Sequence, residues 1–261
     1  MLLFLGGTFS LQAQDEKSAA DLYNEGVELM KAKDFAGALP LFEQAIDKAA
    51  TAEEGDSTAM QVTELAKKNG MRTAYSLGNK QRKAKEYDAA IETFDKGLAM
   101  GDFYALYMGK AQALDKSDKK EKAVEAYFTA GKKYEEAGQE EAKVVKIYRT
   151  AFIKLARAKK YDAIIEKAEA HPVALKNADV SYYVAKAYSS KKDYEKALMH
   201  AQAATAAAPD GKDKGKFYML EGEINTKLTK TGDAIAAYKK VESGSKYADR
   251  AAYLIKELGG E

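Results

Sequence analysis

The chain has 261 residues, of which 46% are hydrophobic and 31% charged, a composition typical of a globular protein and not of a disordered one. Its 42 basic and 40 acidic residues leave a net charge of +2, which excludes a global field for capturing nucleic acid. Cysteine is absent, which excludes disulfides, thiol nucleophiles and cysteine-ligated metals. Proline is scarce while alanine, lysine and glutamate are abundant, so helix is favoured almost throughout.

The first element is an apolar run from Leu2 to about Leu11, followed by small and polar residues up to Gln14. It is too short to span a bilayer, but it suits the apolar core and cleavage site of a secretory signal. No Lys or Arg precedes it, so we interpret residues 1–14 as a signal peptide whose start lies upstream, with cleavage after Ala13 or Gln14. This predicts an exported, periplasmic protein; a cytoplasmic protein with an apolar tail is the alternative.

One phrase recurs along the rest of the chain, beginning at Lys33, Lys85 and Lys192. A Lys and an acid lead to an aromatic, a small residue follows three later, and a hydrophobic stripe continues at helical spacing. The small or apolar residues that align are Ala38, Ala90, Ala123, Ile164, Ala197 and Ala234. Their spacing scatters around 34 residues, apart from a longer first interval, and a period in this range predicts a solenoid of helical units.

Each phrase is preceded by a helical packing stripe with its own small or apolar centre. In five cases this centre lies twelve residues before the aligned residue: Gly26, Gly78, Phe152, Ala185 and Gly222. Gly109 precedes Ala123 by fourteen residues, which predicts two extra residues in the turn around Lys116–Lys119.

A first helix with a central small residue, a tight turn closing on an aromatic and a second helix reading A-x3-F-x2-A resembles the tetratricopeptide repeat. The best matches are Gly26, Phe35, Ala38, Phe42 and Ala45, then Gly78, Tyr87, Ala90, Phe94 and Gly97, then Gly222, Ala234, Tyr238 and Val241. The resemblance implies an all-α, right-handed superhelical solenoid of helix-turn-helix units. The fourth unit departs most, with bulky Phe152 and Ile164 at small-residue positions and a second helix cut short at His171-Pro172.

We expect one solenoid domain over residues 15–261. Its repeats are predicted at 19–50, 71–101, 102–135, 145–172, 178–209 and 215–243, with a closing helix at 246–258 that covers the last repeat. The interval from Asp47 to Met71 keeps helical periodicity, so it is expected to lengthen the two neighbouring helices around a turn at Gly55-Asp56-Ser57. A longer loop and a binding element are the alternatives for this interval.

No motif for catalysis is present. The only histidines, His171 and His200, fall in different repeats and suit ordinary helix-terminal or surface roles. The glycines of Gly211–Lys216 lack the spacing of a phosphate loop and predict a turn. We therefore expect no enzyme activity, no metal and no cofactor.

In tetratricopeptide arrays the first helices line a concave groove, and the resemblance implies one here. Four of the five arginines fall on the stripe that would face it, whereas acids are rare there, Asp179 and Glu223 being the exceptions. Arginine binds carboxylates through a paired fork, and Tyr and Arg are enriched at interface centres. The predicted groove residues are Tyr23, Asn24, Arg72, Tyr75, Asn79, Arg82, Lys83, Tyr107, Lys110, Arg149, Arg157, Tyr183 and Lys186. The alternative is that these arginines pair with acids of neighbouring repeats.

The sequence thus predicts a non-enzymatic scaffold that binds an acidic or extended peptide segment of a protein partner in a basic, tyrosine-bearing groove. Nucleic acid and membrane spanning are not expected. One alternative is a glycan or cell-wall binding module, which the absence of tryptophan disfavours. Another is a structural subunit of an envelope assembly that pairs through its convex face or its closing helix.

Overall fold

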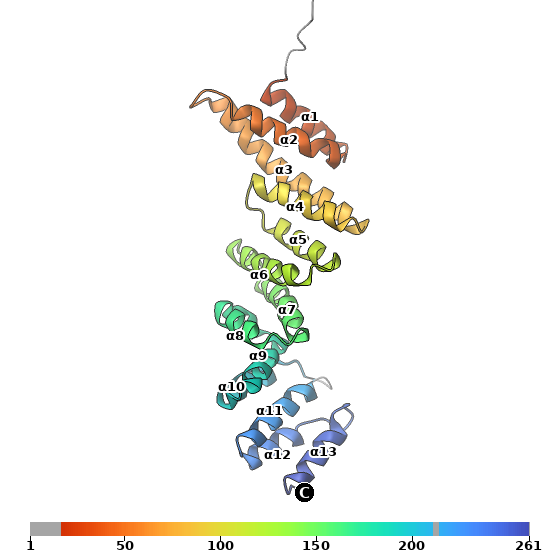
Figure 1. Cartoon of the computed structure of the whole chain (residues 1–261), viewed down its shortest axis with the longest axis vertical. Helices are drawn as coiled ribbons and strands as arrows, with labels where there is room; N and C mark the ends of the chain where they lie inside the picture. Colours follow the sequence, from red (N-terminus) through yellow and green to blue (C-terminus); the bar gives the residue numbers. More distant parts are fainter. Residues whose placement is uncertain (1–16, 211–213, 261) are drawn as a thin grey trace, which may run out of the picture. The chain divides into compact units, whose positions relative to one another are not determined.

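The computed structural model describes residues 17–210 and 214–260, so the predicted signal peptide at 1–14 lies outside the described residues. Within these ranges all regular structure is helical, which confirms the predicted all-α class (Figure 1). The chain divides into two compact units, Met1–Gly109 and Lys110–Glu261. In the described part of the chain, no helix is both long and apolar enough to cross a membrane.

The helices come as consecutive pairs. The first unit contains α1 (Ala19–Lys31), α2 (Phe35–Ala49), α3 (Ser57–Lys83), α4 (Tyr87–Met100) and the first part of α5 (Tyr104–Lys116). The second contains the rest of α5, then α6 (Lys120–Glu136), α7 (Glu141–Arg157), α8 (Tyr161–Ala170), the 3-10 segment η1 (Pro172–Lys176), α9 (Ala178–Ser190), α10 (Tyr194–Ala207), α11 (Gly215–Lys227), α12 (Thr231–Lys239) and α13 (Ala248–Glu257).

A three-residue turn joins the two helices of each pair, and its middle residue has a left-handed backbone. These residues are Lys33, Lys85, Asp118, Lys159, Lys192 and Thr229, with φ between 53° and 67°. In the first turn, Lys33 N donates to Met30 O at 3.0 Å and Asp34 N donates to Leu29 O at 2.9 Å, which satisfies the last carbonyls of α1. Asp34 then caps α2 by accepting from Gly37 N at 3.0 Å. The turn therefore ends one helix and begins the next.

The turn between α5 and α6 corrects one prediction. It has the same three residues, 117–119, as the other turns, so the expected insertion around Lys116–Lys119 is wrong. The residue equivalent to Gly26 and Gly78 is then Ala111, which is fully buried, and not Gly109. This register moves Tyr107 and Lys110 away from the predicted groove stripe and onto the packing side of α5, where both are half-buried.

The core of each pair is built on the aligned residues. All six, from Ala38 to Ala234, are fully buried. In the first, second and sixth pairs, the residue four after the aligned one is an aromatic that lies directly on the small residue of the first helix. A Cβ at Gly78 would come within 2.6 Å of the Phe94 ring, and one at Gly222 within 2.3 Å of the Tyr238 ring. Glycine is required there because two helices approach closely over a flat ring. The small and aromatic positions of the tetratricopeptide pattern thus form one contact.

The fourth pair, α7 and α8, fills the same space with aromatics. Phe152 is fully buried and lies edge-on against Phe128, with ring centroids 5.3 Å apart. His171, directly after α8, stacks on Tyr148 at 4.6 Å and on Phe128 at 5.3 Å. The predicted early end of the second helix at His171-Pro172 is therefore confirmed, and the imidazole closes the aromatic cluster.

The interval between the first two pairs extends only one helix. α2 ends at Ala49, so the expected lengthening of that helix is wrong, whereas α3 begins at Ser57 and runs for 27 residues. Asp56 caps it, accepting from Thr58 N at 2.8 Å and Ala59 N at 3.1 Å. Val62 and Ala66 of this extension belong to the core formed with α1 and α2.

At the other end of the chain, α13 lies against the last pair. Ala251 is 3% exposed and packs with Met219, Ala234 and Tyr238. Leu254 and Ile255 add partly buried apolar surface to the same cluster. The last pair thereby buries an apolar face that would otherwise meet water.

Candidate functional site

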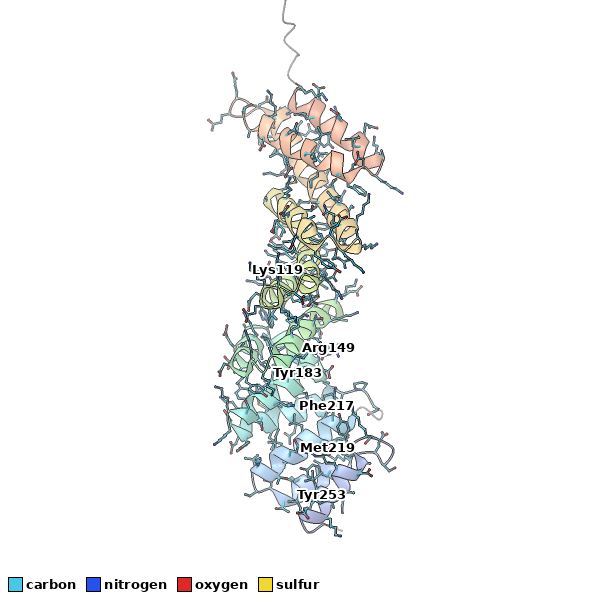
Figure 2. The ribbon with its side chains drawn as sticks, turned by 45° about the vertical axis from the view of Figure 1, so that its right-hand side comes forward. Lys119, Arg149, Tyr183, Phe217, Met219 and Tyr253 are labelled. Atoms are coloured by element: carbon cyan, nitrogen blue, oxygen red, sulfur yellow. The ribbon has the colours of Figure 1, made fainter. Side chains whose placement is uncertain are left out.

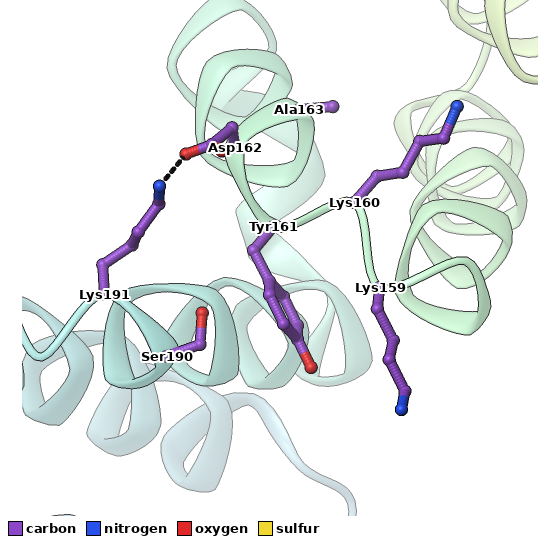
Figure 3. Close-up of a pocket in the computed structure, with 7 residues that line it drawn as sticks. All are labelled: Lys159, Lys160, Tyr161, Asp162, Ala163, Ser190 and Lys191. Atoms are coloured by element: carbon purple, nitrogen blue, oxygen red, sulfur yellow. Dashed lines mark ion pairs between the residues drawn. The ribbon is translucent and has the colours of Figure 1, made fainter.

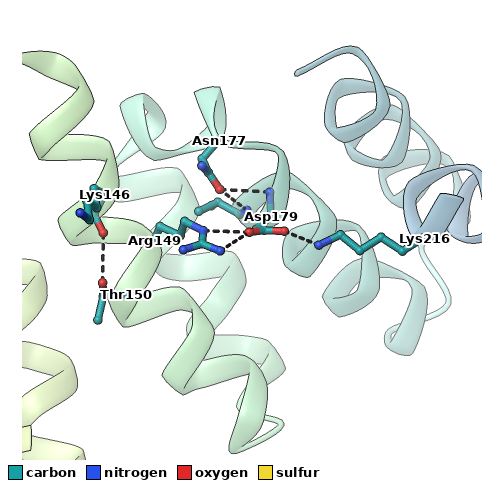
Figure 4. Close-up of polar contacts among 7 residues, drawn as sticks. Lys146, Arg149, Thr150, Asn177, Asp179 and Lys216 are labelled. Atoms are coloured by element: carbon teal, nitrogen blue, oxygen red, sulfur yellow. Dashed lines mark hydrogen bonds and ion pairs between the residues drawn. The ribbon is translucent and has the colours of Figure 1, made fainter. Parts of the chain in front are cut away.

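Three successive first helices of the second unit meet at a single carboxylate. Arg149 of α7 donates from Nε and Nη2 to Oδ2 of Asp179, at 2.8 and 2.5 Å. Lys216 of α11 donates from Nζ to Oδ1 of the same residue at 2.6 Å (Figure 4). Asp179 of α9 therefore bridges two cations, one on each side of its own helix.

Local structure fixes the place of Asp179. The side chain of Asn177 caps α9 by accepting from Asp179 N at 3.0 Å and Val180 N at 3.3 Å. Asp179 consequently stands in the first turn of the helix, where the exposed N–H groups favour a negative charge. The position of Asp179 at the start of α9 therefore stabilises its negative charge.

Together, the side chains of Arg149, Asp179 and Lys216 carry a net positive charge. Burial acts to raise the pKa of Asp179, but hydrogen bonds from Lys216 and Arg149 outweigh it and hold the pKa below its usual value, so the carboxyl is ionised near neutral pH. Two positive charges then face one negative charge. The side chain of Asp179 is only 17% exposed, whereas those of Arg149 and Lys216 are 42% and 31% exposed. The outer sides of both cations are thus open to a ligand.

Aromatic rings surround the cations. Tyr182 lies edge-on to Phe217 at 5.7 Å and to Tyr183 at 5.6 Å. The ammonium of Lys186 lies 5.5 Å from the centre of the Tyr182 ring, and that of Lys216 lies 4.7 Å from the centre of Phe217. Burial, together with nearby Tyr247 and Glu223, raises the pKa of Tyr182 to about 12, so its phenol stays neutral. We call the set Arg149, Asp179, Tyr182, Tyr183, Lys186, Lys216 and Phe217 the cationic–aromatic cluster; Figure 2 labels three of its members.

Predicted groove residues of the first unit gather mainly on α3. Arg82 donates from Nη2 to Asn79 Oδ1 at 3.0 Å, while its Nε is buried and has no partner among the described residues. Asn79 in turn donates to Tyr75 O at 2.8 Å. Tyr75 is 39% exposed and lies edge-on to Phe103 at 5.9 Å. The exposed Arg72 and Lys83 are on the same helix.

The predicted residues of α1 make no comparable group. Tyr23 is half-buried, and its hydroxyl accepts from Asn69 Nδ2 at 3.1 Å. Asn24 is exposed. Within the second unit, Arg149, Tyr183 and Lys186 come together in the cationic–aromatic cluster, whereas Arg157 does not.

Arg157 lines a depression of about 630 Å³ among α6, α7 and the start of α8, beside an ion pair between Lys154 and Asp115. A second depression of about 560 Å³ lies at the turn before α8, with Lys191 and Asp162 paired at its edge (Figure 3). Neither places a nucleophile beside a base, so the chemistry they offer is that of a charged surface.

The two histidines lie in separate aromatic stacks. Burial, with a contribution from Lys167, lowers the pKa of His171, and burial lowers the pKa of His200, whose ring stacks on Tyr188 at 5.5 Å. Both imidazoles are neutral near pH 7. Among the described residues, no group of three or more His, Asp or Glu side chains is arranged to hold a metal ion.

The predicted groove list omitted Tyr182 and Lys216, although both lie on the predicted stripe, and Phe217, which lies outside it. The sequence did carry a signal for the pairing: Asp179 and Lys216 both lie six residues before the central small residue of their helices, Ala185 and Gly222. Residues at equivalent positions of neighbouring first helices can lie side by side, and Lys216 of α11 does contact Asp179 of α9.

No protein-family model matches the sequence, and no curated protein sequence matches it. Among solved structures, the chain is similar to BtubC from P. vanneervenii, with 18% identity, a TM-score of 0.43 and coverage of 84% of this chain and 93% of that chain. It is also similar to a thermophilic tetratricopeptide repeat protein of Thermus thermophilus (17% identity, TM-score 0.29, coverage 92% and 100%). A tetratricopeptide repeat protein of Parabacteroides merdae gives 14% identity, a TM-score of 0.32 and coverage of 94% and 100%. These TM-scores are below 0.5; the repeated helix pairs of this chain are established by the packing described above.

Proposed function

We propose that this protein is a non-enzymatic scaffold that holds an acidic, extended segment of a partner protein on the first helices of its repeats. The observation that carries the proposal is the cationic–aromatic cluster, in which Arg149, Lys186 and Lys216 expose positive charge beside tyrosine rings. Cations bind the carboxylates of the segment, and the rings of Tyr182 and Tyr183 contact its apolar atoms.

Rigid helices favour such binding. The side chains project from α7, α9 and α11, which are packed by buried residues such as Val184 and Phe217. Binding therefore requires little additional ordering of this protein.

In the first unit, Arg72, Arg82 and Tyr75 of α3 form a second basic and aromatic surface. Arg82 is held on this surface by its hydrogen bond to Asn79.

The test is a pull-down with residues 15–261 from an envelope extract, at low and high salt, with bound proteins identified by mass spectrometry. Capture of a protein with an acidic segment, lost at high salt, is expected because exposed charges are screened. Salt-insensitive retention of a polysaccharide would instead indicate the glycan-binding alternative. A mass that rises with concentration in the absence of partner would indicate a structural subunit.

Matched variants locate the binding surface. Arg72→Glu with Lys186→Glu reverses two exposed charges that have no ion pair among the described residues, so capture should fall by at least tenfold with melting unchanged. Lys122→Glu with Lys239→Glu, on the exposed sides of the second helices α6 and α12, makes the same change in net charge and is the control. Equal loss of capture in this control would argue against a first-helix surface.

Export is proposed from the composition of residues 1–14 alone. Cell fractionation of the native protein, together with N-terminal sequencing of its mature form, tests this. Recovery of the intact N-terminus from the cytoplasm would refute export and leave the binding proposal standing.

A further inference from the structure

Asp179 is enclosed by the two cations that a partner would need. Three hydrogen bonds reach its two oxygens, from Arg149 and Lys216. A carboxylate of a bound acidic segment would approach these same two cations from their exposed sides. The structure therefore contains, within the cluster, the kind of group that the proposed ligand would supply.

A purely structural role explains this arrangement poorly. Ion pairs with partly exposed cations contribute little to stability, and α9 is already held by the fully buried Val180, Val184 and Ala187. Arg149 and Lys216 link Asp179 to α7 on one side and to α11 on the other, through side chains that are 42% and 31% exposed. Lys216 is also placed independently by the rings of Phe217 and Tyr182.

We propose that Asp179 is an internal stand-in for a partner carboxylate, which keeps Arg149 and Lys216 oriented when the site is empty and competes with the partner's Asp or Glu side chains when it is filled. The inference rests on the proposed function and deepens it, because it names the residue that limits affinity. Its ionised state near neutral pH follows from the same hydrogen bonds.

The competition has a measurable size. Removing the charge of Asp179 while keeping its shape frees two cations and abolishes repulsion of the incoming carboxylate. Affinity for an acidic peptide should therefore rise about tenfold, which corresponds to about 1.4 kcal/mol.

The experiment measures fluorescence anisotropy of a labelled oligoglutamate peptide, with oligoglutamine as the neutral probe. Asp179→Asn is compared with Glu43→Gln, which also removes one negative charge from an acid paired with a lysine, Lys96, but on the second helices α2 and α4. We expect Asp179→Asn to bind oligoglutamate about tenfold more tightly and Glu43→Gln to stay within about twofold of the natural protein. Asp179→Glu, which keeps the charge, should resemble the natural protein.

The outcomes separate the two proposals. If the natural protein binds oligoglutamate and Asp179→Asn binds it equally or more weakly, the stand-in role is wrong and the scaffold proposal survives. If neither the natural protein nor any variant binds it, both proposals fail. A large loss of melting temperature in Asp179→Asn, shared by Asp179→Glu, would make Asp179 a structural tie and overturn the inference.

Discussion

The contact between Gly222 and Tyr238 gives a sharp test of the helix-pair packing. In Gly222→Ala the new methyl group would lie 2.3 Å from Cε1 and 2.7 Å from Cδ1 of the tyrosine ring, where ordinary contact needs about 3.5–4.0 Å. Tyr238 is 2% exposed, so the ring has no open space into which it can move. The helices must separate or the ring must leave its preferred rotamer.

The expected magnitude follows from two opposing effects. Overpacking costs about 1–3 kcal/mol, and a contact as short as 2.3 Å places Gly222→Ala in the upper half of that range, at about 2–3 kcal/mol. Replacing glycine by alanine within a helix returns about 1 kcal/mol. A net loss of about 1–2 kcal/mol corresponds to a decrease of about 2–8 °C in melting temperature for a unit of this size.

The assay is urea and thermal unfolding followed by circular dichroism, with Gly232→Ala as the matched control. Gly232 is exposed in the first turn of α12, and a Cβ there would meet nothing within 4 Å. This control should be neutral or slightly stabilised. In a Tyr238→Leu background the cost of Gly222→Ala should shrink, because the smaller side chain leaves room for the methyl group. Gly222→Ala as stable as the natural protein would refute the proposed contact.

Three further predictions concern the histidines and the turns. Burial lowers the pKa of His171 and His200 in the folded state, so the unfolded chain binds protons first, and the free energy of unfolding should fall as the pH drops below about 6.5. Urea titrations should show this, and a His171→Gln, His200→Gln double variant should lose part of it. Lys85→Val should destabilise the first unit by about 1–2 kcal/mol because a β-branched residue tolerates a φ of 67° poorly, whereas Lys85→Gly should be neutral or stabilising in the same denaturant titration. Asp56→Ala should cost about 1 kcal/mol through the lost cap of α3, with Glu54→Ala as the unaffected control; equal stability of the two would contradict the capping role.

The helical pairs were predictable because five of the six aligned residues, all except Ile164, are alanines that meet one physical requirement. A small side chain at Ala38 or Ala234 lets two helices approach, and the aromatic four residues later fills the remaining space. The register of α5 was not predictable from the pattern alone. Gly109 and Ala111 are both small, and only the constant three-residue turn decides between them.

The site was predictable in part. The arginine stripe identified Arg149 as a surface cation, and the alternative that it pairs with an acid of a neighbouring repeat describes its observed contact with Asp179. The acid that Arg149 contacts depends on how α9 is positioned relative to α7, and the aromatic packing around Phe152 and His171 fixes that position. The sequence pattern of a single repeat does not contain this information.

The left-handed turn residues have a consequence for proteolysis. Four of the six are lysines, at positions 33, 85, 159 and 192, and each is exposed, so each presents a trypsin cleavage site at the closed end of a helix pair. A protease needs an extended strand of substrate, which a turn closed by two backbone hydrogen bonds does not offer. Cleavage at a given lysine therefore requires that particular pair to open, and the pattern of early tryptic fragments would rank the helix pairs by local stability.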